Sequence, residues 1–192
     1  MQVCYNGRVI SRKGFLRLEW GLSLAIIAFA LAWATVRGLP LAGPWQATPR
    51  AVAAGAATGA ALWLAIPLLF RIPDMRRVFD TVLVPFSRTL EPADIITIAL
   101  LSGVSEELLF RGVLLPEIGL IGSSVLFGLL HALNWTYAAW AALIGAGFGL
   151  LALYGGTLVT PVVAHATYNL GALVVLRHWR LREPAPQGGP NV

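Results

Sequence analysis

Long apolar runs alternate with short polar stretches along this chain, and most of the runs are long enough to cross a membrane. The hydrocarbon core of a bilayer is about 30 Å thick and takes about 20 helical residues to cross. The pattern predicts six membrane helices, at residues 18–36, 51–70, 94–115, 119–134, 137–154 and 157–176. The fourth and fifth are shorter, so we expect them to be tilted and buried within a bundle.

Residues 72–93, between the second and third runs, follow a different pattern. Val78, Val82 and Phe86 recur every four residues and are flanked by arginines, which is typical of a helix lying on a membrane surface. Pro85 should limit the length of this helix. We interpret it as an ordinary amphipathic connector rather than a lipid sensor. The predicted fold class is therefore all-α: a polytopic membrane helix bundle with an interfacial connector.

Composition and charge agree with this fold class. Of the 192 residues, 57% are hydrophobic and 12% are charged, whereas a soluble domain has about 25% charged residues. Cys4 is the single cysteine, so no intrachain disulfide can form. The net charge of +5 comes from basic residues at the ends of the apolar runs, where arginine anchors helices to lipid headgroups. We therefore expect membrane lipid, and no nucleic acid, as a partner.

The basic residues also predict an orientation. The side that holds both chain ends and the connector carries nearly all of the arginine and lysine, and the other side carries only Arg37 and Arg50. Positively charged loops remain in the cytoplasm. We therefore expect both termini to be cytoplasmic, in a bacterial plasma membrane.

Ionisable and amide side chains occur inside three of the predicted helices, where a charge costs at least about 2.5–3.5 kcal/mol. The set consists of Glu106, Glu107 and Arg111 in the third helix, His131 in the fourth, and His165 and Asn169 in the sixth. At 1.5 Å per helical residue, four of them lie about 12–18 Å from the outer ends of their helices. These four are Glu106, His131, His165 and Asn169. They can share one cavity if the three helices pack together.

Helical geometry gives the two neighbouring glutamates different surroundings. Glu107 precedes Arg111 by four residues, which favours an ion pair within the helix. Glu106 points about 100° away around the helix and has no cation nearby on it. We therefore interpret Glu106 as a general base that faces a cavity, with Glu107 and Arg111 as its structural support.

The other polar residues complete a possible catalytic site. His165 and Asn169 lie on one helix face and offer two donors for a developing oxyanion. His131 is able to join them, to position the attacking water or to protonate the leaving amine, and Phe127 should pack beneath it. Zinc or another divalent metal has Glu106, His131 and His165 as candidate ligands, but His-Glu-x-x-His is absent. Metal dependence is left open, and the favoured mechanism does not require a metal.

The order of the motifs resembles the CPBP family (CAAX proteases and bacteriocin-processing proteins, also called Abi). Glu-Glu-x-x-x-Arg stands at 106–111, Phe-x-x-x-His at 127–131 and His-x-x-x-Asn at 165–169. The resemblance implies an intramembrane endopeptidase for peptide or protein substrates at the membrane, CAAX-like lipidated ones included. It also implies that the residues matching Glu106 and His131 activate water and that those matching His165 and Asn169 stabilise the oxyanion.

Two other function classes compete with the protease. The same polar residues would brace the bundle of a non-enzymatic protein of bacteriocin-immunity or scaffold type, and carboxylates with histidines also serve proton relays. We rank the relay last because the sequence shows no convincing internal repeat. The predicted organisation is one membrane domain at 1–177, with its catalytic core at 92–177. Residues 178–192 should be a disordered cytoplasmic tail.

Overall fold

Helices form nearly all of the regular structure in the computed structural model, which describes residues 3–5, 8–41 and 45–179. In chain order the elements are β1 (Val3–Tyr5), β2 (Arg8–Ile10), α1 (Arg12–Arg37), α2 (Pro49–Trp63), α3 (Ile66–Leu69), α4 (Pro73–Val78), the π-helix η1 (Phe79–Leu83), α5 (Val84–Thr89), α6 (Pro92–Glu107), the π-helix η2 (Leu108–Leu114), α7 (Leu115–Leu130), α8 (Trp135–Gly155) and α9 (Val159–His178). The predicted helical membrane bundle is confirmed. The antiparallel pair of β1 and β2 is an addition that was not predicted.

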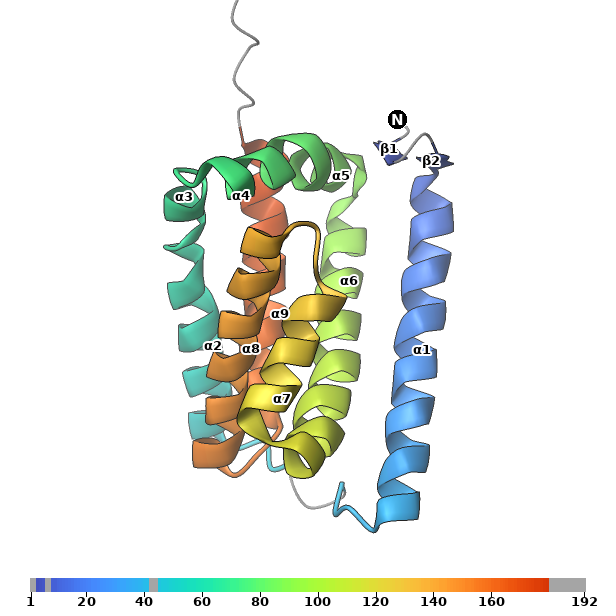
Figure 1. The fold of residues 1–192 in the computed structure, drawn as a ribbon, viewed down its shortest axis with the longest axis vertical. Helices are drawn as coiled ribbons and strands as arrows, with labels where there is room; N and C mark the ends of the chain where they lie inside the picture. The colour runs from blue at the N-terminus through green and yellow to red at the C-terminus, as the bar shows by residue number, and fades with distance from the viewer. Residues whose placement is uncertain (1–2, 6–7, 42–44, 180–192) are drawn as a thin grey trace, which may run out of the picture.

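Five helices in the described part of the chain are long and apolar enough to cross a membrane, namely Arg12–Arg37, Pro49–Leu69, Pro92–Leu130, Trp135–Gly155 and Val159–His178. The third of these has 39 residues and contains the third predicted helix and most of the fourth. It reverses direction at Gly119, where φ is 72°, a conformation that glycine adopts without strain. As a result α7 runs back along the bundle (Figure 1) and packs against η2 and α8.

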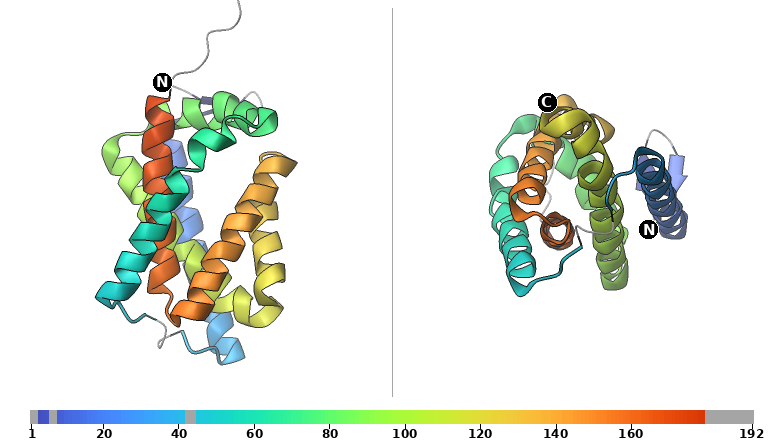
Figure 2. Two further views of the ribbon diagram at one scale, coloured as in Figure 1. Left: turned by 90° about the vertical axis from the view of Figure 1, so that its left-hand side faces the viewer. Right: turned by 90° about the horizontal axis from the view of Figure 1, so that it is seen from below.

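The two described ends of the chain lie at the same end of the bundle (Figure 1). The connector formed by α4, η1 and α5 crosses that same end, as a surface helix would. The views in Figure 2 place α9 inside the bundle, where it contacts α2, α5, α6 and α8. Trp179, just past α9, stacks on Phe70 at 3.8 Å between ring centroids. The remainder of the predicted tail, residues 180–192, lies outside the described residues.

Close packing between α2 and α9 depends on two of the glycines. A Cβ at Gly55 would lie 2.5 Å from the carbonyl oxygen of Thr160, and a Cβ at Gly59 would lie 2.5 Å from that of Ala164. Glycine therefore lets the two backbones touch, as small residues do in membrane bundles. This contact fixes α9 in the centre of the bundle, where it carries His165.

Each of the two π-helices precedes a proline. Pro85 lies in α5 after η1, and Pro116 lies in α7 after η2. A proline ring crowds the carbonyl group four residues earlier and lacks an N–H, and the wider π turn makes room for it. The prediction that Pro85 limits the connector helix was wrong, because the helical path continues to Thr89.

Candidate active site

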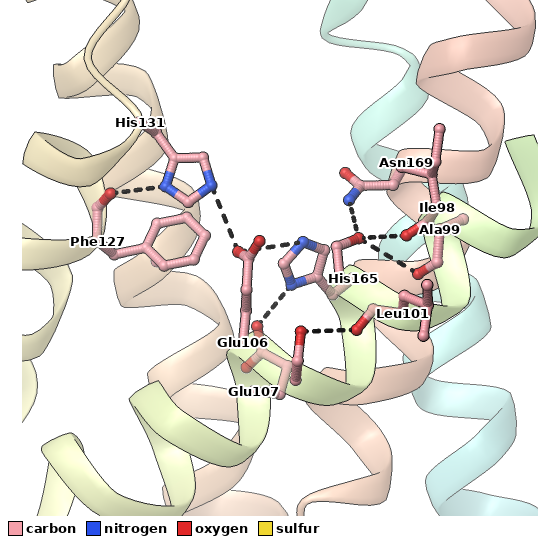
Figure 3. A network of polar contacts seen from close by, with 12 residues as sticks. Ile98, Ala99, Leu101, Glu106, Glu107, Phe127, His131, His165 and Asn169 are labelled. Carbon is pink, nitrogen blue, oxygen red and sulfur yellow. Dashed lines mark hydrogen bonds and ion pairs between the residues drawn. The ribbon is translucent and has the colours of Figure 1, made fainter. Parts of the chain in front are cut away.

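Helices α6, α7 and α9 bring the predicted catalytic side chains together near the middle of the bundle (Figure 3). Oε2 of Glu106 lies 3.3 Å from Nε2 of His131 and 4.0 Å from Nε2 of His165. The fourth predicted helix was drawn through residue 134, but α7 ends at Leu130 and His131 is its C-cap. Asn169 lies one turn beyond His165 on α9. The four side chains share one layer, and their catalytic roles stay predictions.

Glu107 forms the centre of a second, fully buried cluster. Its Oε1 accepts hydrogen bonds from Nη1 of Arg111 at 2.9 Å and from Nδ1 of His165 at 2.7 Å. Nη2 of Arg111 donates to the carbonyl oxygen of Gly145 at 2.7 Å, and the ring of Phe127 lies 4.9 Å from the guanidinium carbon. The ion pair expected from the spacing is therefore present, and it also orients His165. Each charge is paired, which offsets the cost of burying it.

The hydrogen bonds define which nitrogen of each histidine carries a proton. Nδ1 of His131 lies 2.8 Å from the carbonyl oxygen of Phe127, and a carbonyl only accepts, so Nδ1 is the donor. Nδ1 of His165 donates to Glu107 for the same reason. Both Nε2 atoms therefore face Glu106 and are free to take or release a proton. Oε2 of Glu106 is buried and receives no hydrogen bond from the described residues, and the same holds for Oε2 of Glu107.

Asn169 is oriented by a residue that the sequence analysis missed. Oγ of Ser102 donates to the carbonyl oxygen of Ile98 at 2.8 Å, so it must accept the bond from Nδ2 of Asn169, 2.9 Å away. The amide nitrogen of Asn169 therefore faces Ser102, and the second of its two N–H groups takes no part in that bond. A serine inside a membrane helix often bonds its own backbone, so the sequence held no signal for this role.

A cavity of about 160 Å³ opens beside these residues. It is lined by Phe127, His131, Tyr137, Trp140, Ala141, Ile144, Phe148, His165, Tyr168 and Asn169. One water needs about 10–15 Å³, so several fit. An apolar cavity of about 150 Å³ adjoins it and shares Tyr137, Trp140, Tyr168 and Asn169. The two larger cavities contain none of the four predicted catalytic residues. We place the chemistry beside the 160 Å³ cavity, because His131, His165 and Asn169 line it, although Glu106 does not.

The candidate metal ligands were Glu106, His131 and His165. Over residues 3–5, 8–41 and 45–179, no group of three His, Cys, Asp or Glu side chains is placed to hold a metal ion. No step below is assigned to a metal, and metal dependence stays open to experiment.

Residues 88–171 match the family model described as "Type II CAAX prenyl endopeptidase Rce1-like". The matched stretch spans all three motifs and therefore includes every residue of the candidate site. No curated protein and no solved structure shows significant similarity to the chain.

Proposed function

We propose that this chain, whose residues 88–171 match the family model of type II CAAX prenyl endopeptidases, hydrolyses peptide bonds with water activated by Glu106. The match confirms the resemblance seen in the motifs and indicates a membrane protease at the level of the family. The role of the glutamate and the choice of substrate are the proposed parts.

One observation carries the proposal. The buried Oε2 of Glu106 has two imidazole Nε2 atoms within 4.0 Å and no hydrogen bond of its own. Both histidines line a cavity of about 160 Å³, although Glu106 itself is not among the residues that line it. A carboxylate held this way suits a general base, which must lie within hydrogen-bond reach of the proton it removes.

The first chemical step is attack by water on the scissile carbonyl carbon. Water bound to Glu106 beside His131 forms the new C–O bond while one of its protons passes to the Glu106 carboxylate. The carbonyl oxygen becomes an oxyanion, which the free N–H of Asn169 stabilises. His165 adds a donor at Nε2 when its ring carries both protons, because its Nδ1–H is committed to Glu107.

The second step completes the hydrolysis. The oxyanion reforms a carbonyl group, the C–N bond breaks, and the leaving amine takes the proton held by Glu106. The products are one carboxylic acid and one amine, and the Glu106 carboxylate is regenerated for another cycle. His131, whose Nε2 lies 3.3 Å from Glu106, is placed to pass this proton to the amine.

We propose membrane-associated peptides as substrates, CAAX-like lipidated ones included. The apolar cavity that adjoins the site reaches residues of the connector, Phe79 and Leu83. By this route a peptide anchored at the end of the bundle that holds both termini would reach Glu106 from the membrane surface. Cytoplasmic termini, predicted from the arginine distribution, would make this the cytoplasmic surface.

Cleavage of a mixed library of membrane-associated peptides, prenylated ones included, by purified protein in nanodiscs tests the proposal. Glu106→Gln should lower the rate by about 10²–10⁴-fold, the usual contribution of a general base. Glu117→Gln is a matched control, because Glu117 pairs with the exposed Arg37. Cleavage that survives in Glu106→Gln would refute the mechanism. A parallel reaction with a chelator reports on metal dependence.

The competing interpretation is a non-enzymatic protein of bacteriocin-immunity or scaffold type. It predicts no cleavage by either protein and an unchanged biological function in Glu106→Gln.

A further inference from the structure

Tyr168 is a polar residue of the catalytic cavity that none of the motifs includes. It precedes Asn169 on α9 and lines the cavity together with Asn169, His131 and His165. The side chains of α9 contact different neighbours: His165 bonds Glu107 on α6, and Tyr168 contacts Trp140 on α8.

The contact with Trp140 determines what the Tyr168 hydroxyl can do. Nε1 of Trp140 lies 3.3 Å from Oη of Tyr168. An indole N–H only donates, so the phenol oxygen is the acceptor and its own hydrogen points elsewhere. Among the described residues, no acceptor receives that hydrogen.

The surroundings of the hydroxyl suggest its partner. Much of the cavity wall is apolar, including Ala141, Ile144 and Phe148. The polar side chains there are those of the candidate site together with Tyr137 and Trp140. A buried donor normally has a partner, which water would supply in the resting protein. In a substrate complex, a peptide carbonyl oxygen that enters this space can accept this hydrogen bond.

Tyr168 and Asn169 are held in the same way. Ser102 accepts a bond from the Asn169 amide, and Trp140 donates one to the Tyr168 phenol. Each side chain is held by a hydrogen bond to a residue of a neighbouring helix and retains one hydrogen to donate. Donors fixed before the reaction stabilise a developing charge without any reorganisation cost.

We propose that Tyr168 is a further catalytic residue, whose phenol O–H donates to the oxygen of the scissile carbonyl as it becomes an oxyanion. Trp140 is then a positioning residue that holds the phenol oxygen. This inference rests on the proposed peptide hydrolysis and adds a neutral donor beside Asn169. It also gives the oxyanion a donor that does not depend on the protonation of His165.

Tyr168→Phe tests the inference with a peptide that the wild type cleaves. Removal of one oxyanion donor should lower kcat by about 10²–10³-fold and leave KM nearly unchanged. Trp140→Phe should cause a smaller loss in the wild type and no further loss in Tyr168→Phe, since it acts through the phenol. Tyr154→Phe is the matched control, because Tyr154 is 88% exposed and outside this cavity.

Three results would overturn the inference: a wild-type kcat in Tyr168→Phe, an effect on KM alone, or additive losses from the two substitutions. If Glu106→Gln abolishes cleavage while Tyr168→Phe does not, the inference fails and the proposed function stands. If the wild type cleaves no peptide in the library, both fail together.

Discussion

Arg111→Met removes the guanidinium that neutralises Glu107 at the base of the candidate site. Both side chains are almost completely buried, with 2% and 0% of their surfaces exposed. Methionine can occupy much of the same space between the aromatic rings that surround Arg111. The substitution therefore changes mainly the charge. It leaves the Glu107 carboxylate buried, with His165 as its remaining donor.

The expected loss of stability is large. Breaking a buried ion pair by removing one partner costs about 3–5 kcal/mol, because the other charge remains buried. In a protein of this length, 192 residues, each kcal/mol shifts Tm by about 2–4 °C. Arg111→Met should therefore lower Tm by about 6–20 °C.

A matched arginine substitution at an exposed ion pair controls for the loss of charge. Arg37 pairs with Glu117 and has 55% of its side chain exposed. Exposed pairs contribute about 0–1 kcal/mol, so Arg37→Met should lower Tm by at most about 4 °C. Thermal unfolding of the variants in the same nanodisc, followed by circular dichroism, measures both shifts.

The double variant Glu107→Gln with Arg111→Met separates charge from packing. Replacing a buried ion pair by neutral residues is often close to neutral for stability, so the double variant should recover most of the Tm lost in Arg111→Met. Its cleavage rate should stay low, because an amide oxygen holds His165 less strongly than a carboxylate. The reasoning is refuted if Arg111→Met is no less stable than Arg37→Met, or if the double variant is the least stable of all.

Two further substitutions test individual contacts. Ser102→Ala removes the acceptor of the Asn169 amide. It should lower kcat by about tenfold or more, as loss of a supporting bond does at other sites, with little change in Tm. Unchanged kinetics would show that Asn169 does not need Ser102 for its role. Gly59→Val places a side chain against the carbonyl oxygen of Ala164, 2.5 Å from the new Cβ. It should lower both Tm and activity, because it forces α2 and α9 apart. Gly147→Ala is the control, because Gly147 faces open space, and it should change neither.

The apolar runs predicted most of the helices to within a few residues, since hydrophobicity over a long window is a local property. The run at 137–154 corresponds to α8, Trp135–Gly155. The predicted break between the helices at 94–115 and 119–134 lies close to the observed reversal at Gly119. The pattern did not single out Gly119 as the turn, because one glycine in an apolar run does not reveal a positive φ. The hairpin at the N-terminus was missed because its strands have three residues each, too few for an alternating pattern.

The same distinction between local and non-local information decides which contacts of the candidate site could be predicted from the sequence. Spacing within one helix predicted the Glu107–Arg111 pair, because residues four apart share a helix face. The bonds from His165 to Glu107 and from Asn169 to Ser102 join different helices. Such bonds depend on how each helix is rotated and shifted against its neighbour, which spacing along one helix does not contain.

The contrast between the two glutamates explains why the neighbours of Glu106 are histidines. Glu107 is neutralised by Arg111, a group that never releases its proton, and this makes it a fixed support. An arginine beside Glu106 would form the same permanent pair and occupy the carboxylate. A histidine is instead able to give and take a proton near neutral pH. Glu106 therefore retains an available oxygen between two reversible proton carriers, as a base that must accept a proton from water and return it to an amine requires.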